Sequence, residues 1–270
     1  MTLDLRSRFG LHATPFTREI GVEQYFTLPF FDEALTGLRR AVEERMSAAL
    51  IAPAGTGKTA LLRALRARLP EARFRVHYVK VTGLSKRDMC REIAVACGAE
   101  PAGTYPMLVR RLQEHFLAAS DTAGLRPVLL LDEAHDLRVE VLAMIRLLTN
   151  FDMDSRLVVS VILSGQKPLA KLLGRDDLED VARRLAHVAS LRVLSRDETV
   201  RYVDHRLTVA GASRVPFDAG AQDALYEIGR GNLRATDCLA GKALELAHDG
   251  DCDAVSSSHV VEARRRVFPS

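Results

Sequence analysis

Short apolar runs alternate with amphipathic stretches through the middle of the chain. Runs such as "LVVSVIL" (157–163) and "VLLLD" (128–132) are typical of buried strands, whereas apolar positions recurring every three or four residues predict helices. The alternation of the two patterns predicts a parallel sheet with crossover helices. The predicted strands are 48–52, 74–81, 127–132, 157–163 and 188–193. The predicted helices are 58–69, 85–97, 105–119 and 139–149, the second with Ser85 as N-cap and Gly98 as its stop.

The two ends of the chain follow other patterns. Residues 1–35 hold five of the ten Phe, interrupted by Pro15 and Pro29, which predicts a packed aromatic arm. After residues 191–195 only helical periodicity remains. We therefore expect an arm at 1–35, an α/β core at 36–195 and a small helical lid at 196–270.

Length and composition agree with one such core. A chain of 270 residues with 47% hydrophobic residues can fill one large α/β core plus a small appendage. The apolar runs are far shorter than the roughly 20 residues that cross a bilayer. The first residues, "MTLDLRSRFG", contain neither an apolar signal core nor a small-residue cleavage site. We expect a cytoplasmic protein without a membrane partner.

The stretch "APAGTGKT" (52–59) matches the phosphate-binding pattern G-x-x-x-x-G-K-[ST] except at its first position, where Ala52 stands for Gly. It follows an apolar strand and opens an amphipathic helix, as that pattern requires. Its glycines allow backbone N–H groups to surround a β-phosphate, and Lys58 can reach the β/γ oxygens. Ala52 is compatible with this if it holds an ordinary backbone conformation. The predicted nucleotide contacts are Pro53, Ala54, Gly55, Thr56, Gly57, Lys58, Thr59 and Ala60.

The stretch "LLLDEAHDL" (129–137) ends an apolar strand in two adjacent carboxylates. With a phosphate loop elsewhere in the chain, the pair suits nucleotide hydrolysis. Asp132 would hold Mg²⁺ together with Thr59, and Glu133 would orient and deprotonate the attacking water. ATP and Mg²⁺ are the expected cofactors.

Other interpretations of this stretch are weaker. A metal centre on His135 has no His or Cys at supporting spacing, so His135 is expected to cap the turn or face a neighbour. A "DEAH" helicase needs two similar core domains, and the chain carries a single phosphate loop. A nucleotide switch that barely hydrolyses ATP would not need Glu133.

With these motifs, the chain resembles an AAA+ ATPase of the ExeA-like branch, which includes the transposition ATPases of the TniB and TnsC kind. The resemblance covers nearly the whole chain. Besides "APAGTGKT" and "LLLDEAHDL", it is carried by "FGLHATPF" (9–16), "FFDEALTGLRRAV" (30–42), "IRLLTNFD" (145–152), "VILSGQKPLAKLL" (161–173), "RDETVRYVDHRLTVAG" (196–211) and "GNLRATDCLAGKALELA" (231–247).

The resemblance implies further site residues. Ser164, with Gln166 as the adjacent alternative, matches the residue that senses the γ-phosphate. Arg184, with Arg183 as the alternative, matches the arginine that acts across a subunit boundary, and Arg234 matches the lid arginine. An arginine supplied in trans implies an ATP-dependent ring or helical filament.

Charge is distributed unevenly. The chain has a net charge of +3, yet residues 61–91 hold nine Lys or Arg against two acids, whereas residues 196–270 hold ten against twelve. Lys80, Thr82, Lys86 and Arg87 run from a strand into a helix N-terminus, where they could meet DNA phosphates. A solvated basic face over a core helix explains the same residues.

We therefore expect a regulator of transposition that assembles on duplex DNA and directs a transposase. The alternative is an ExeA-like secretion or envelope-assembly ATPase that acts on protein partners.

Overall fold

The protein is described here by a computed structural model, in which residues 4–268 are described. Residues 1–3 of the predicted arm and 269–270 of the predicted lid lie outside this range. Contacts divide the chain into two compact units. One takes in the chain up to Thr27, Ala54–Gly57 and the chain from Arg192 on; the other comprises Leu28–Pro53 and Lys58–Leu191. The arm, core and lid boundaries stay a prediction.

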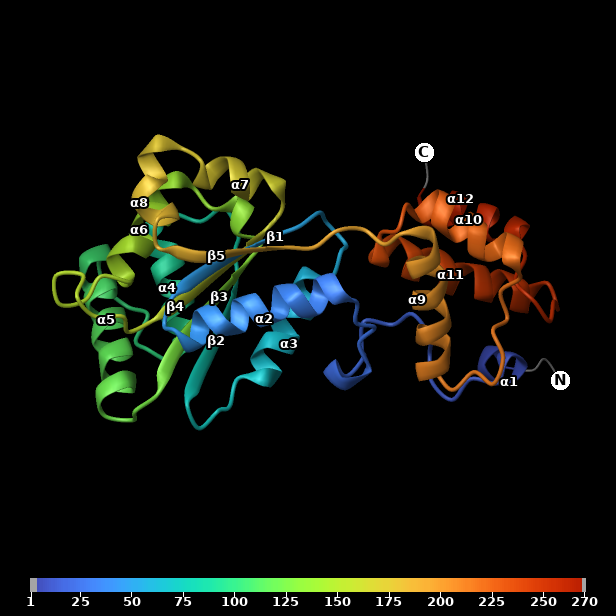
Figure 1. The fold of residues 1–270 in the computed structure, drawn as a ribbon, viewed down its shortest axis with the longest axis horizontal. Coiled ribbons are helices and arrows are strands. Elements are labelled where there is room, and N and C mark those ends of the chain that lie inside the picture. The colour runs from blue at the N-terminus through green and yellow to red at the C-terminus, as the bar shows by residue number, and fades with distance from the viewer. Residues whose placement is uncertain (1–3, 269–270) are drawn as a thin grey trace. The chain divides into compact units, whose positions relative to one another are not determined.

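A parallel five-stranded sheet forms the centre of the second unit (Figure 1). Its order within the described residues is β2-β3-β4-β1-β5. The strands are β1 (Ser47–Ile51), β2 (Phe74–Lys80), β3 (Arg126–Asp132), β4 (Ser160–Gly165) and β5 (Leu185–Ser190). The predicted α/β class and parallel sheet are confirmed.

Helices connect these strands and cover the sheet. α2 packs against β1 and β5 and against α3, whereas α4 packs on β2 and α5 on β3. Ser85 accepts a hydrogen bond from Asp88 N and Gly98 ends α4 in the left-handed region, as the sequence predicts. The elements of this unit are α2 (Pro29–Glu43), α3 (Lys58–Arg68), α4 (Lys86–Cys97), α5 (Tyr105–Asp121), η2 (Ala134–Asp136), α6 (Val139–Leu148), α7 (Lys167–Leu173), η3 (Asp176–Leu178) and α8 (Glu179–Ala182).

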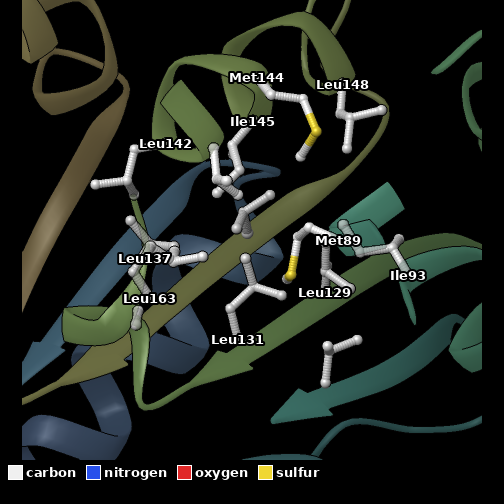
Figure 2. Packing of buried hydrophobic residues seen from close by; sticks show 14 of the residues in the cluster. Met89, Ile93, Leu129, Leu131, Leu137, Leu142, Met144, Ile145, Leu148 and Leu163 are labelled. Carbon is white, nitrogen blue, oxygen red and sulfur yellow. The ribbon is translucent and has the colours of Figure 1, made fainter. Parts of the chain in front are cut away.

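The largest hydrophobic cluster lies between α4, α5 and α6 and one face of the sheet. Leu129, Leu131 and Leu163 point from β3 and β4 into this cluster, where Met89 and Ile145 meet them (Figure 2). The residues between them, such as Leu130 and Ile162, are also fully buried, so both faces of the sheet are covered. This explains why the strands are continuous apolar runs.

The other unit is helical and includes the first part of the chain. It contains α1 (Leu5–Phe9), η1 (Val22–Gln24), α9 (Arg196–Val209), α10 (Ala219–Gly229), α11 (Leu233–Asp249) and α12 (Ser257–Val267). Phe9, Leu11 and Phe16 are buried among the helices after residue 195. The first aromatic residues are therefore part of a helical core.

Arg206 connects separate segments of this unit by hydrogen bonds. Its guanidinium donates to Asp237 (Nη1–Oδ2 3.0 Å) and to the carbonyl oxygen of Thr17 (Nη2–O 2.5 Å). The Arg206 side chain is 8% exposed, so the pair with Asp237 is desolvated. In residues 4–268, no helix has the length and apolar character to cross a membrane.

Two strands differ from their predicted positions. β4 is Ser160–Gly165 instead of 157–163, and β5 is Leu185–Ser190 instead of 188–193. Their ends follow their neighbours: within residues 4–268, β5 pairs with β1 alone, from Ser47↔Leu185 to Ile51↔Ser190. Leu191 and Val193 lie beyond the last backbone partner that β1 provides, which is Ile51 opposite Ser190. The sequence pattern also did not predict the helices α2, α7 and α8.

Candidate nucleotide-binding site

The carboxyl ends of β1, β3 and β4 meet at one edge of the sheet. β4 lies between β3 and β1, with Leu131 opposite Leu163 and Leu50 opposite Ser164. Asp132 follows Leu131 directly, so the register brings its carboxylate beside Ser164. This edge, where the strand order reverses, is where open α/β sheets bind ligands.

The loop after β1 has the backbone that a phosphate loop requires. Gly55 (φ 73°) and Gly57 (φ 96°) occupy the left-handed region, which a side chain would disfavour. Ala52 is not among the described residues with positive φ, and its N–H donates to Gly165 O at 3.0 Å. The first position of the motif therefore does not need glycine here.

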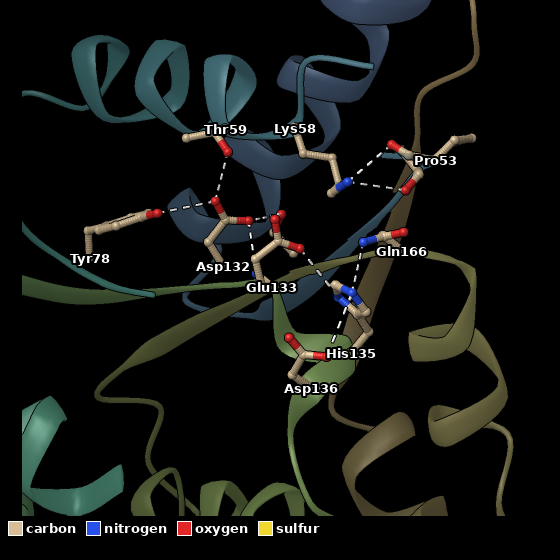
Figure 3. A network of polar contacts seen from close by, with 11 residues as sticks. Pro53, Lys58, Thr59, Tyr78, Asp132, Glu133, His135, Asp136 and Gln166 are labelled. Atoms are coloured by element: carbon tan, nitrogen blue, oxygen red, sulfur yellow. Dashed lines mark hydrogen bonds and ion pairs between the residues drawn. The ribbon is translucent and has the colours of Figure 1, made fainter. Parts of the chain in front are cut away.

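Lys58 is folded back over this loop. Its Nζ donates to the carbonyl oxygens of Ala52 (3.3 Å) and Pro53 (3.1 Å), and the residue is 6% exposed (Figure 3). Both of these acceptors are backbone carbonyl oxygens of the loop itself. The glycine backbone and an ammonium held at the loop are what a nucleotide phosphate requires, so the loop fits such a phosphate.

Asp132 receives hydrogen bonds on both carboxylate oxygens. Oδ1 accepts from Ser164 Oγ (2.8 Å) and from the Glu133 backbone N–H (3.0 Å). Oδ2 accepts from Thr59 Oγ1 (2.8 Å) and from the Tyr78 hydroxyl (3.2 Å) (Figure 3). Asp132 is 2% exposed, so these donors replace the water that its charge would otherwise bind.

Thr59 and Asp132 provide the oxygen ligands that Mg²⁺ prefers. A hydroxyl and a carboxylate in direct contact are a hard donor pair suited to a hydrated magnesium ion carried by phosphates. These two residues therefore fit the metal, as Lys58 fits the phosphates.

Tyr78 is a site residue that the sequence analysis missed. It lies on β2, the neighbour of β3, and burial together with the Asp132 carboxylate raises its pKa to about 12. A phenol with this pKa stays protonated and donates at physiological pH. Its position beside Asp132 follows from strand order, for which the local pattern around "VHYVK" gives no signal.

Glu133 stands where the chain leaves β3. It adopts a left-handed conformation (φ 58°, ψ 33°), and its side chain is 30% exposed. His135 follows on the short helix η2 and faces Glu133. This position agrees with the second of the two expectations for His135, that it faces a neighbouring residue. The two carboxylates thus have different surroundings: Asp132 is enclosed by donors, whereas Glu133 is partly open to solvent.

The sequence profile of a family described as "AAA domain" matches residues 39–173. This range is half of the chain and contains both the phosphate loop and the Asp132–Glu133 pair.

The chain belongs to the AAA domain family.

A curated relative, general secretion pathway protein A of Aeromonas hydrophila, is 31% identical over 244 residues. The match covers 88% of this chain and 44% of that protein, so this chain spans less than half the length of the relative.

Solved structures share the fold of this AAA protein. Cdc6p from Pyrobaculum aerophilum matches with a TM-score of 0.77 at 17% identity, covering 94% of this chain and 71% of that one. The Aeropyrum pernix ORC1 protein, solved in complex with DNA, matches with a TM-score of 0.70 at 18% identity. This match covers 93% of this chain and 68% of ORC1. RuvB of Thermotoga maritima, a Holliday junction branch migration motor, matches with a TM-score of 0.63 at 17% identity. This match covers 94% of this chain and 74% of RuvB.

The arginines expected from the resemblance lie in different settings. Arg184 directly precedes β5 and forms a two-pronged ion pair with Asp154 (2.7 and 2.5 Å). Its hydrogen bonds lower the pKa of Asp154. Arg183 pairs with Glu179 one turn earlier and is much more exposed, 72% against 25% for the Arg184 side chain. The role of each stays a prediction.

Arg234 lies in the first turn of α11, and its side chain is exposed. In the same compact unit, its backbone N–H donates to Gly55 O at 3.3 Å, and Asn232 Nδ2 donates to Ala54 O at 2.6 Å. Asn232 also caps α11 by accepting from Ala235 N. The sequence analysis missed Asn232, although an Asn before a helix is a recognisable N-cap signal.

The basic residues proposed for DNA lie where β2 runs into α4. Lys80 and Thr82 are exposed, and Lys80 is the register partner of Asp132. Lys86 Nζ lies 5.7 Å from the centre of the Tyr105 ring, and Arg87 donates to Gly103 O at 3.2 Å. Ser85 already occupies the Asp88 N–H, so this helix N-terminus offers one fewer amide to a phosphate.

Proposed function

We propose that this AAA protein is a Mg²⁺-dependent ATPase that binds duplex DNA and regulates transposition by directing a transposase. The observation that carries the ATPase assignment is the contact of Thr59 with the enclosed carboxylate of Asp132, beside the buried Lys58. Pro53 to Ala60 and Arg234 would hold the nucleotide, and Thr59 with Asp132 would hold the magnesium ion.

Each residue would perform a separate task during hydrolysis. Lys58 would neutralise charge on the β/γ oxygens, and Ser164 would respond to the γ-phosphate from the strand beside Asp132. Glu133 would take a proton from the attacking water. When bound, Mg²⁺ would neutralise the charge that develops on the phosphate oxygens. Arg184 of a neighbouring copy would add positive charge at the same place.

DNA binding is supported by a second group of basic residues, which lies on the side of the sheet where β2 and β3 begin. Arg73 and Arg126 lie at the amino ends of β2 and β3, each 5.8 Å from the centre of the Phe74 ring. In the described part of the chain, neither makes a salt bridge. Burial and the positive charges of Arg45 and Arg73 lower the pKa of Arg126, and the Glu43 carboxylate opposes them only in part. A phosphate backbone would relieve this repulsion.

This arginine group consists of Arg73 and Arg126, at the amino ends of β2 and β3, and Arg45, just before β1. The residues predicted from the sequence (Lys80, Thr82, Lys86 and Arg87) lie at or beyond the carboxyl end of β2. The two groups are therefore separate candidates for phosphate contact and can be removed separately.

The experiment is a titration of duplex DNA, with ATP and magnesium, at several salt concentrations. We expect DNA to stimulate ATP turnover and the affinity to fall with salt, with a slope of about 0.9 per phosphate contact on logarithmic axes. The Lys80→Ala/Lys86→Ala/Arg87→Ala variant should lower that slope; Arg73→Ala/Arg126→Ala measures the other group. Lys242→Ala in the acidic C-terminal region is the matched control, and Lys58→Ala should abolish ATP binding.

A second function is favoured by the relative named general secretion pathway protein A. An ATPase acting on protein partners in secretion or envelope assembly would hydrolyse ATP with the same site. It would show no salt-sensitive DNA binding and no stimulation by DNA. That result would overturn the transposition proposal and leave the ATPase proposal intact.

A further inference from the structure

Glu133 and His135 present two buried polar atoms to each other. Glu133 Oε2 and His135 Nδ1 are 3.4 Å apart (Figure 3). Across the described residues, neither atom has a hydrogen-bond partner. A carboxylate oxygen can only accept, whereas a ring nitrogen donates when it carries the proton. The contact is therefore favourable only if the proton is on Nδ1.

Gln166 sets the position of that proton. Its amide nitrogen lies 2.8 Å from the other ring nitrogen, His135 Nε2. An amide nitrogen only donates, so Nε2 accepts and the neutral ring carries its proton on Nδ1. The reversed amide would place a lone pair of Nδ1 against the Glu133 carboxylate, which is the less favourable arrangement. The Asp136 carboxylate is 3.9 Å from Nε2, too far to compete.

The backbone brings these three residues together. The left-handed conformation of Glu133 ends β3 and starts η2, which returns His135 to the side of Glu133. Gly165 lets η2 approach the end of β4, because a Cβ there would lie 3.1 Å from His135 N. Gln166 follows Gly165 directly and so reaches the ring.

We propose that His135 is a positioning residue for Glu133. Its Nδ1–H holds Oε2, which leaves the other oxygen of Glu133 to orient water, and Gln166 fixes the ring in the required tautomer. This inference rests on the proposed role of Glu133 in hydrolysis. The contact is longer than a good hydrogen bond, and catalytic contacts of this kind commonly tighten when the site fills.

Two substitutions at His135 separate this role from simple packing. Asn places its amide nitrogen near the position of Nδ1, whereas Gln places it near Nε2. We expect His135→Asn to keep most of the kcat. His135→Gln should lose about 10- to 100-fold in kcat, part of the roughly 10²–10⁴-fold that a positioned general base contributes. The dissociation constant of a fluorescent ATP analogue with magnesium should stay unchanged in both.

The controls make each outcome decisive. In a Glu133→Gln background, which should bind ATP without hydrolysing it, His135→Gln should cause no further loss of turnover. Equal effects of Asn and Gln, or a kcat unchanged by His135→Gln, would overturn the positioning role while the ATPase assignment stands. Absence of turnover in the wild-type protein, or full turnover in Glu133→Gln, would overturn the role of Glu133 and this inference with it.

Discussion

Asp132 combines almost complete burial with a charge. Its four donors come from four separate places in the sequence: Thr59, Tyr78, Ser164 and the amide of Glu133. Because both oxygens accept hydrogen bonds, the carboxylate is held in one orientation, and the metal would take the place of the Thr59 hydrogen on Oδ2. Such preorganisation favours a metal ion that demands strict geometry, as Mg²⁺ does.

Tyr78→Phe tests one of these donors. The variant should lose about 0.5–1.5 kcal/mol of unfolding free energy, the usual net value of a hydrogen bond. The folded pKa of Tyr78, about 12, lies above the unfolded value, so the contact stabilises the fold below about pH 10 and is lost as pH rises toward 12. Urea unfolding at about pH 6 and about pH 9 should therefore give the same difference.

Tyr226→Phe is a control for the loss of a hydroxyl in the other unit. A Tyr78→Phe difference that shrinks markedly between the two pH values would contradict the raised pKa and the donor role of the phenol.

At the scale of elements, the helical unit depends on a desolvated ion pair. Arg206 on α9 joins Asp237 on α11 and the chain at Thr17, and the Tyr202 hydroxyl donates to Asp237 at 2.8 Å. The pair fixes two helices and the aromatic segment relative to one another. Burial opposes the charge on Asp237 and raises its pKa, whereas Arg206 lowers it.

Asp237→Ala should therefore destabilise the protein by about 3–5 kcal/mol, since it leaves a buried guanidinium without its carboxylate. Thermal or denaturant unfolding measures this loss. Glu245→Ala is the matched control on the same helix, because Glu245 pairs with Lys242 near the surface and should cost about 0–1 kcal/mol. Similar losses of unfolding free energy in the two variants would show that the Arg206–Asp237 pair stabilises the fold no more than a surface ion pair does.

At the scale of the whole molecule, we predict that Arg184 connects the site to assembly. Its guanidinium is paired with Asp154 of its own chain. This ion pair would have to open before Arg184 could contact the nucleotide of a neighbouring copy. Assembly would then exchange an internal carboxylate for the phosphates of the neighbour. This gives a physical reason for hydrolysis to depend on protein concentration.

Sedimentation with a non-hydrolysable ATP analogue should show nucleotide-dependent growth of the wild-type protein. Arg184→Ala should keep ATP binding and lose about 10³-fold in turnover, the low end of the roughly 10³–10⁵-fold effect of an arginine supplied in trans. Arg183→Ala, which removes an exposed pair with Glu179, should behave like the wild type. A strict monomer with full turnover would refute assembly as a requirement.

The hydrophobic pattern of the sequence predicted most of the strands because both faces of the sheet are buried. Strands such as Arg126–Asp132 are therefore nearly continuous apolar runs, which a local pattern reveals. The ends of β4 and β5 were displaced from their predicted positions. A strand ends where its neighbour stops offering backbone partners, and the apolar residues Leu191 and Val193 lie past that point.

The phosphate loop and the acidic pair could be recognised for a similar reason. The residues from Pro53 to Ala60 are contiguous, and their glycines are required by a local backbone conformation. Ser164 was identified through the resemblance, and the register beside β3 accounts for its contact with Asp132. Each of these signals is contained in a short stretch of sequence.

The sequence by itself thus determined a parallel α/β core, its phosphate loop and the two carboxylates at the end of one strand. Only the tertiary structure decided that Tyr78 donates to Asp132, that His135 lies between Glu133 and Gln166, and that Arg184 is paired with Asp154. These contacts depend on which strands are neighbours and in which register. Periodicity records whether a side chain is buried, and it carries no information about the distant residue that it meets.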